Sequence, residues 1–206
     1  MTIFPNHAAF DAATPLFQIL PEAAADAFAR EALLDAAMGP GRRRKSSEAI
    51  RRGRLPASGL AFAAKLADES LCGTVRLWNI AAGRACGQPV PALLLGPLAV
   101  DPNLKQAGIG STLMRHSIAE AARRGHGAIV LVGDPDYYER FGFSATPAAA
   151  LSMPGPFEKH RLLALELRQA ALSGAEGIIE PTGAGGDDCV GAGSQIRAAG
   201  ATITQA

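Results

Sequence analysis

The pattern of apolar and polar residues predicts a chain of strands and helices. Short runs rich in leucine, β-branched and aromatic residues indicate strands, whereas longer stretches with apolar residues every three or four positions indicate helices. The predicted strands are residues 16–20, 60–65, 72–80, 91–100, 128–132, 143–146 and 161–167. The predicted helices are residues 22–38, a short helix capped by Ser46 or Ser47, residues 108–124 and residues 136–141. Strands and helices alternate in the second half, which favours an α/β fold with a mixed sheet and parallel neighbours joined across a helix.

Glycine and proline residues mark where these predicted elements begin and end. Pro21 is expected at the first position of the first helix, where a missing backbone N–H costs nothing. Residues 39–41, Gly-Pro-Gly, are expected to end that helix, and residues 68–70 suit a hairpin turn. Residues 81–83 are expected to end the third strand, and Gly142 the last helix.

The composition changes after Leu172. From Ser173 to Ala206 glycine and alanine dominate, large apolar residues are scarce and no periodicity remains. We therefore expect one domain over residues 1–172, followed by a loosely ordered tail over residues 173–206. Removal of this tail is expected to leave the fold intact.

Charge and cysteine content argue against several classes of protein. The net charge is +1, whereas proteins that bind duplex nucleic acid generally need a strong basic surplus. Cys72, Cys86 and Cys189 are far apart and odd in number, so they predict neither a zinc site nor a disulfide framework. The chain starts without the features of a signal peptide, and no apolar run approaches the roughly 18 residues of a membrane helix. We expect a soluble, cytoplasmic protein that needs no metal.

The strongest candidate for chemistry is the segment PLAVDPNLKQAGIGSTLMRH, in which a strand, a glycine-containing turn and a helix follow one another. The N-terminus of a helix offers unpaired N–H groups and a partial positive charge, and glycine lets the backbone approach an anion closely. Gly108 and Gly110 therefore predict a pyrophosphate cradle. A Walker loop is disfavoured because no lysine follows Gly110, and a dinucleotide fingerprint because Leu113 occupies the third glycine position.

The segment resembles the acyl-CoA motif of the GNAT superfamily of N-acetyltransferases, [QR]-x-x-G-x-[GA], with Lys105 in place of the usual Gln or Arg. The segment PDYYERFGF resembles the second signature of that family, with Tyr138 at the family tyrosine. Gly96-Pro97 interrupts the strand where members of the family carry a bulge. The resemblance covers residues 17–167 and is closest to small bacterial predicted N-acetyltransferases. It implies a sheet whose central strands splay apart, flanked by helices, with the acyl-pantetheine arm in the gap.

The resemblance also implies a mechanism, in which an amine attacks the thioester of acetyl-CoA directly in a ternary complex. The Leu98 N–H would donate to the carbonyl oxygen, Val100 would hold the pantetheine amides, and Tyr138 would protonate the leaving thiolate. The cofactor-binding set also includes Lys105, the amides of Gln106, Ala107, Gly108, Ile109 and Gly110, and the hydroxyls of Ser111 and Thr112. The base stays open among Glu48, Asp134, His116 and water, although for His116 a packing role is favoured.

Seven arginine and lysine residues lie within residues 42–54. They suit an acidic acceptor, the 3′-phosphate of CoA, nucleic acid, or a solvated loop, which we favour. For Trp78, core packing is favoured over a place in the acceptor pocket. The expected partner is an amine, either a small molecule or a protein, and a homodimer is left open. No membrane contact is expected, and nucleic acid is disfavoured. A non-catalytic acyl-CoA-binding regulator and an unrelated nucleotide-binding α/β protein are the alternatives.

Overall fold

The computed structural model describes residues 16–186, which form a mixed eight-stranded sheet with helices on both faces. Six strands follow the order β1-β2-β3-β4-β5-β7, while β8 pairs with β3 and β6. The strands are β1 (Gln18–Pro21), β2 (Ala61–Lys65), β3 (Leu71–Ala85), β4 (Gln88–Val100), β5 (Ala128–Val132), β6 (Leu151–Ser152), β7 (Leu162–Glu166) and β8 (Glu176–Pro181). The α-helices are α1 (Ala27–Met38), α2 (Ser46–Arg51), α3 (Ile109–Arg123) and α4 (Pro135–Tyr138).

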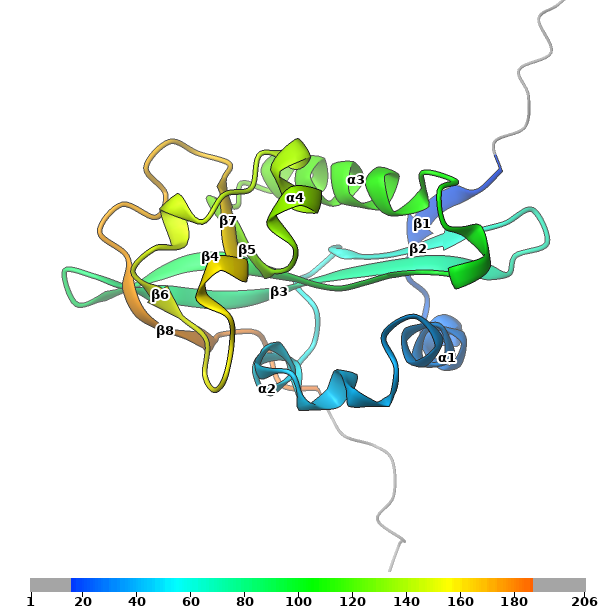
Figure 1. The fold of residues 1–206 in the computed structure, drawn as a ribbon, viewed down its shortest axis with the longest axis horizontal. Coiled ribbons are helices and arrows are strands. Elements are labelled where there is room, and N and C mark those ends of the chain that lie inside the picture. The colour runs from blue at the N-terminus through cyan, green and yellow to red at the C-terminus, as the bar shows by residue number, and fades with distance from the viewer. Residues whose placement is uncertain (1–15, 187–206) are drawn as a thin grey trace, which may run out of the picture.

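The helices are divided between the two faces of the sheet. α3 and α4 lie on one face, and α1 and α2 lie on the other (Figure 1). Each face has its own apolar cluster, and the alternation along β3 supplies both: Val75 and Leu77 face α3, whereas Trp78 and Ile80 belong to the opposite cluster with Ile50 of α2. A strand covered on both sides needs apolar residues at consecutive positions. This explains the uninterrupted apolar run of β4.

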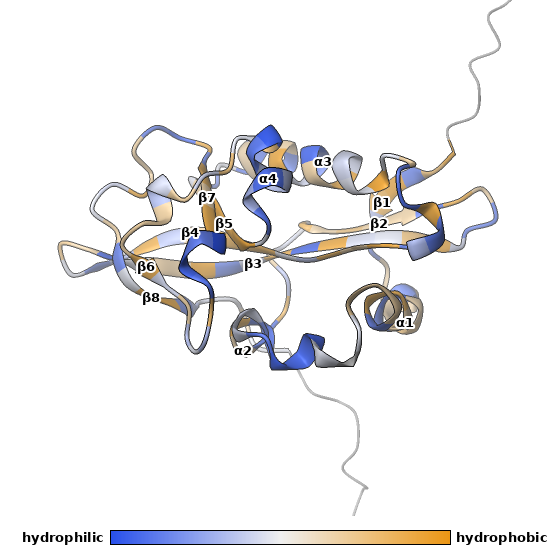
Figure 2. Ribbon diagram, in the orientation of Figure 1, coloured by the Kyte–Doolittle hydropathy of each residue, from blue (hydrophilic) through white to orange (hydrophobic). Residues whose placement is uncertain are grey.

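The hydropathy of the chain follows this layering. β5 is hydrophobic along its length, while α4 and the segment between α1 and α2 are hydrophilic (Figure 2). That segment is a 3₁₀ helix, Pro40–Arg44, which carries three arginines. Within residues 16–186, no helix is long and apolar enough to cross a membrane.

Most of the predicted elements are confirmed, but several boundaries are wrong. Pro21 ends β1 instead of opening a helix, and a 3₁₀ turn precedes α1. α2 begins at Ser46, with Lys45 at its N-cap, so neither serine caps it. β3 continues through residues 81–83 because β4 and β8 pair with it there. Residues 143–146 form only an isolated bridge, Ser144 with Ala164, and not a strand.

The predicted end of the folded domain at residue 172 is too early. β8 pairs antiparallel with β3 and parallel with β6, and its Ile179 is fully buried. The next residues hold the segment after α2: Leu55 N–H donates to the Ala184 carbonyl at 2.9 Å, and Arg54 Nη1 donates to the Gly183 carbonyl at 2.7 Å. The prediction of a loosely ordered tail is therefore wrong for residues 173–186. Its remaining part, residues 187–206, and Cys189 within it lie outside the described residues, as do residues 1–15.

Truncation tests the contribution of β8. A chain that ends at Leu172 should lose at least about 2 kcal/mol of unfolding free energy, because the buried Ile179 side chain alone contributes about that much. A chain that ends at Gly186 retains every described contact and serves as the control. Urea denaturation followed by circular dichroism measures both; equal stability of the two chains would show that β8 is dispensable.

Candidate functional site

The candidate site forms where β4 is bulged at Gly96 and Pro97. Against β3, the register steps from Val75–Leu98 to Leu77–Leu95, so β4 has one residue more than β3 between these pairs. The peptide bond between Gly96 and Pro97 is cis. The predicted bulge is therefore confirmed.

The strands β4 and β5 separate after the bulge. They pair in parallel only at Leu93–Ile129 and Leu94–Val130, although β4 runs on to Val100. The indole N–H of Trp78, which is buried, donates to the Gly96 carbonyl at 2.5 Å and holds the bulge against β3. Trp78 thus packs in the core, and it also fixes the backbone at the start of the gap.

The backbone of β4 beyond the bulge presents its amides to the gap. The Asp101 N–H donates to the Cys72 carbonyl at 2.9 Å, which fixes the phase of the ladder between β3 and β4. Hydrogen-bonded pairs alternate with non-hydrogen-bonded pairs in an antiparallel ladder. Leu98 and Val100 therefore occupy non-hydrogen-bonded positions opposite β3, so their N–H groups point towards β5. Pairing with β5 has ended at Leu94, which leaves these amides facing the gap.

A crevice occupies the gap between the strands, and four parts of the chain line it. The bulge of β4 and the end of β5 form two walls, α4 contributes Tyr138, and α1, α2 and the segment between them form the remainder. The lining residues are Met38, Arg42, Lys45, Ser47, Glu48, Arg51, Leu95, Gly96, Pro97, Leu98, Leu131, Val132 and Tyr138. Both residues expected to be catalytic, Leu98 and Tyr138, therefore line the same crevice.

Tyr138 is held by close packing of its ring. A Cβ atom at Gly133 would lie 2.1 Å from Tyr138 Cε2, so only glycine allows the ring to pack there. The ring also contacts Tyr137 and Phe143 edge to face, with centroids 4.9 and 6.1 Å away. Burial, with a smaller contribution from Tyr137, raises the pKa of the Tyr138 hydroxyl to about 12. This phenol stays protonated at neutral pH and can act only as a proton donor.

The N-terminus of α3 offers free amides beside the crevice. The first helical hydrogen bond runs from the Thr112 N–H to the Gly108 carbonyl at 3.0 Å, so the N–H groups of Ile109, Gly110 and Ser111 precede it. Gly108 adopts a left-handed conformation, with φ of 77°, and a Cβ there would meet no atom within 4 Å. This open backbone fits a diphosphate.

Four other members of the predicted cradle have amides or side chains that are already bonded or that lie outside it. The Ala107 N–H donates to the Leu104 carbonyl at 3.2 Å, so this amide is already used within the turn. The Thr112 hydroxyl donates to the Gly108 carbonyl at 3.0 Å. Lys105 and Gln106 are exposed next to the cradle, and Gln106 has a φ of 80°.

Tyr137, which the sequence pattern did not single out, also reaches the cradle. A Cβ at Gly110 would lie 3.1 Å from the Tyr137 hydroxyl oxygen and 3.4 Å from a Val100 methyl group. The two adjacent tyrosines therefore face different parts of the site: Tyr138 the crevice and Tyr137 the start of α3. Successive side chains of an α-helix point about 100° apart, which accounts for this.

The three side chains considered as the base lie in different places. Glu48 lines the crevice, is partly buried and accepts a hydrogen bond from Arg51 Nη2 at 2.9 Å. Asp134 is exposed and accepts a bond from the Asp136 N–H at the start of α4. His116 packs edge to face on Phe62, with ring centroids 4.5 Å apart, on the side of α3. Of these three, only Glu48 shares the crevice with Tyr138.

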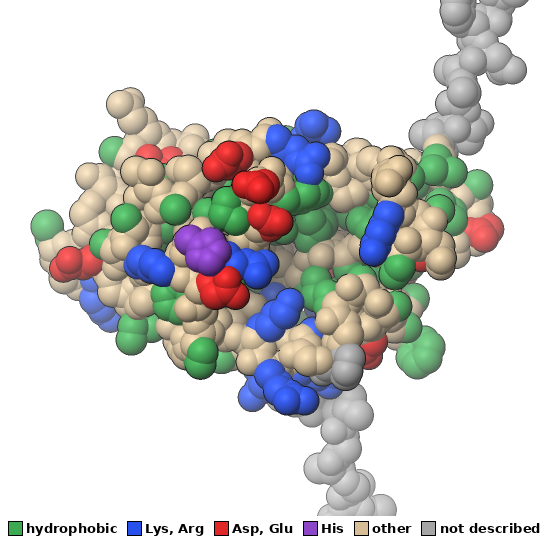
Figure 3. All heavy atoms as spheres, viewed as in Figure 1, with side chains coloured by type: hydrophobic (Ala, Val, Ile, Leu, Met, Phe, Trp, Pro, Cys, Tyr) green, Lys and Arg blue, Asp and Glu red, His purple; other side chains and the backbone are tan. Residues whose placement is uncertain are grey.

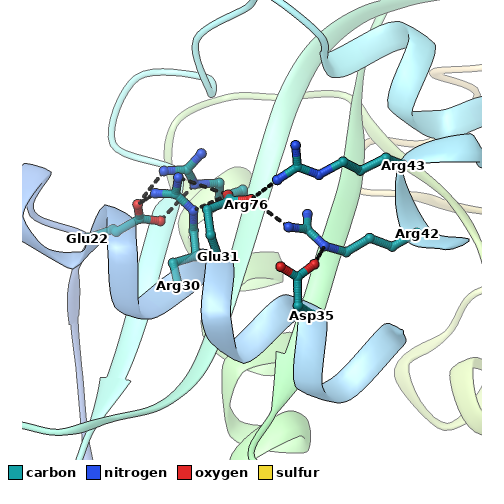
Figure 4. Close-up of polar contacts among 7 residues, drawn as sticks. All are labelled: Glu22, Arg30, Glu31, Asp35, Arg42, Arg43 and Arg76. Atoms are coloured by element: carbon teal, nitrogen blue, oxygen red, sulfur yellow. Dashed lines mark hydrogen bonds and ion pairs between the residues drawn. The ribbon is translucent and has the colours of Figure 1, made fainter. Parts of the chain in front are cut away.

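The basic segment is largely helical and only partly solvated, so the favoured interpretation as a solvated loop is wrong for Arg42 and Arg51. Arg42 is buried and donates to Glu31 and Asp35 of α1, each at 2.6 Å (Figure 4). Arg51 is mostly buried, which lowers the pKa of its guanidinium, yet arginine keeps its charge at neutral pH. Its Nη1 atom would lie 3.5 Å from a Cβ at Gly96, beside the bulge. Sequence spacing could not reveal these contacts because they join α1, α2 and β4 across the fold.

Comparison with known proteins identifies a matching domain family and related structures. Residues 58–145 match the family model described as an acetyltransferase (GNAT) domain. The uncharacterized N-acetyltransferase YhbS of Escherichia coli K12 is 29% identical over 94 residues, which span 46% of this chain and 56% of the relative. The chain thus aligns with about half the length of this curated relative.

Solved structures share the fold. The crystal structure of E. coli YhbS in complex with CoA superposes with a TM-score of 0.70 and 24% identity, covering 86% of this chain and 94% of that one. A GNAT acetyltransferase from Brucella melitensis in complex with acetyl-CoA gives a TM-score of 0.54 and 25% identity, covering 78% and 100%. Residues 58–145, which contain the bulge, the cradle and Tyr138, thus resemble an acetyltransferase (GNAT) domain, and the chain shares the fold of these acetyltransferases.

Proposed function

We propose that this chain is an N-acetyltransferase that transfers an acetyl group from acetyl-CoA to a primary amine by direct attack in a ternary complex. The observation that carries the proposal is the crevice between β4 and β5, where unpaired amides of β4 face Tyr138. The E. coli and Brucella proteins contain CoA and acetyl-CoA, respectively, which supports the same co-substrate here.

The residues present fit this co-substrate. The amides of Ile109, Gly110 and Ser111 and the open backbone at Gly108 would hold the diphosphate. The Val100 N–H would hold the pantetheine arm. Acetyl-CoA supplies the reactive thioester. Lys105 and Gln106, exposed beside the cradle, would contact the phosphates from outside.

Three groups of this chain would perform the chemistry. The Leu98 N–H would donate to the carbonyl oxygen as it gains negative charge. The Tyr138 hydroxyl would donate its proton to the leaving thiolate sulfur. Glu48 would accept a proton from the acceptor ammonium, directly or through water, and its hydrogen bond with Arg51 keeps the carboxylate oriented. Attack, protonation and proton removal therefore converge on the same crevice.

Replacement of Tyr138 by phenylalanine removes the proton donor and keeps the packed ring. We expect kcat for acetyl transfer to fall about 100-fold, within the range for loss of a general acid, while the Kd for acetyl-CoA changes little. Thiol release from acetyl-CoA with a panel of primary amines measures kcat, and calorimetry measures Kd. Tyr137→Phe is the matched control. If the parent protein binds acetyl-CoA but acetylates no amine, the non-catalytic regulator gains support instead.

The pH dependence gives an independent check on Tyr138. Because the pKa of its hydroxyl is raised to about 12, the protonated form required of an acid is present at all lower pH values. We expect no loss of kcat at alkaline pH attributable to this group up to about pH 11. A descending limb near pH 9 that disappears in Tyr138→Phe would contradict the assignment.

The diphosphate cradle is tested at Gly110. Gly110→Val should weaken acetyl-CoA binding at least about tenfold, because its side chain would crowd Tyr137, Val100 and the approach to the α3 amides. Gly110→Ala is the matched variant and should bind more tightly than Gly110→Val, since its single methyl group requires only a small shift of the Tyr137 hydroxyl. Calorimetric titration with acetyl-CoA measures both; unchanged affinity of Gly110→Val would place the diphosphate elsewhere.

A further inference from the structure

A second pocket opens on the α1–α2 side of the sheet and adjoins the crevice. The two share Arg42, Glu48, Arg51 and Pro97. The second pocket extends from the bulge of β4 towards α1 and the end of α2. Its lining residues are Arg30, Glu31, Leu34, Arg42, Arg43, Glu48, Arg51, Arg52, Gly53, Arg76, Trp78 and Pro97.

Positive charge dominates this pocket. Six arginines and two glutamates line it. Glu22 pairs with Arg30 and Arg76, and Glu31 pairs with Arg30, Arg42 and Arg43 (Figure 4). Asp35 pairs with Arg42 in the same cluster. Glu48 pairs with Arg51. Four carboxylates thus pair with five arginines. Within residues 16–186, Arg52 forms no ion pair, so the pocket carries a surplus of two positive charges.

The surplus lies on side chains that solvent can reach. The Arg43 side chain is 65% exposed, and its contact with Glu31 is long, at 3.4 Å. Arg52 is exposed at the end of α2. Figure 3 shows basic side chains along the lower side of the hollowed face, whereas acidic and basic side chains lie together above it near α4. An entering molecule therefore meets a surplus of positive charge on the α1–α2 side.

The geometry of the crevice assigns this side to the acceptor. The free amides of α3 and Tyr137 lie across the sheet from α1 and α2, so a diphosphate bound there leaves the α1–α2 side open for the amine. Glu48 and Arg51 stand where the second pocket meets the crevice. An amine that reaches Glu48 from this side extends its remaining atoms among the arginines.

We propose, on the basis of the acetyl transfer proposed above, that the acceptor is an anionic amine, with a carboxylate or phosphate group bound between Arg43 and Arg52. The guanidinium group donates paired hydrogen bonds to both kinds of anion. A second cationic centre on the acceptor, as in a polyamine, meets repulsion in the same pocket. The competing explanation is that the surplus charge attracts the phosphates of acetyl-CoA instead.

Matched amines test the proposal on the full chain. β-Alanine is compared with β-alaninamide, phosphoethanolamine with ethanolamine, and 1,4-diaminobutane supplies a second positive charge. Thiol release gives kcat/KM for each amine, and calorimetry gives the Kd of phosphoethanolamine and of acetyl-CoA. The double variant Arg43→Gln, Arg52→Gln removes the surplus. Arg44→Gln is the control, because Arg44 is also exposed but does not line the pocket.

We expect kcat/KM to be about tenfold higher for at least one anionic amine than for its neutral partner. Comparison of the β-alanine pair with the phosphoethanolamine pair shows whether a carboxylate or a phosphate is preferred. The double variant should remove this preference by raising KM for the anionic amine, while the Kd for acetyl-CoA stays unchanged. Higher salt should also raise KM for the anionic amine in the parent protein. Equal use of charged and neutral amines, or preference for 1,4-diaminobutane, contradicts the anionic acceptor, whereas no transfer to any amine contradicts the proposed function on which it rests. Weaker acetyl-CoA binding in the double variant supports the competing explanation. Failure of the parent to bind acetyl-CoA would instead overturn the proposed function.

Discussion

The hydrogen bond from the Trp78 indole to the Gly96 carbonyl fixes the bulge in β4 against the centre of the sheet. The extra residue at the bulge ends the pairing of β4 with β5 after Leu94. Unpaired amides inside a fold are costly unless a partner satisfies them. A sheet that keeps the amides of Leu98 and Val100 facing a crevice therefore has a site that an extended molecule with amide groups can complete. The gap between β4 and β5 and the free amides of Leu98 and Val100 therefore both follow from the bulge.

The rest of the site depends on elements that the sheet holds in place. Gly133 allows the Tyr138 ring to pack at the end of β5, and burial keeps its hydroxyl protonated. On the opposite face, Arg42 joins the segment between the helices to α1 through two carboxylates. Contacts from residues 183–184 hold the segment after α2. The wall that carries Glu48 and Arg51 is thus fixed from both ends, which suits a surface that orients a substrate.

The sequence predicts the elements better than their limits, and local motifs better than the distant contacts. The apolar run of β4, the bulge at Gly96-Pro97 and the helix after Gly108 are visible because each depends on neighbouring residues. β8 was missed because only two of its residues are large and apolar, and its stability comes from pairing with β3 nearly 100 residues earlier. Residues 42–54 look like a solvated loop because the carboxylate partners of Arg42 lie in α1, outside the segment. The placement of Tyr137 and Arg51 also arises only when separate elements meet.

The central claim is that the separated strands receive the thioester arm while the start of α3 holds the diphosphate. A crystal structure of the protein with CoA tests this most directly. The account predicts the pantetheine chain between β4 and β5, with hydrogen bonds to the Leu98 and Val100 amides and the diphosphate at Gly108–Gly110. CoA bound outside this crevice, or β4 and β5 paired through Val100 in the complex, would contradict it.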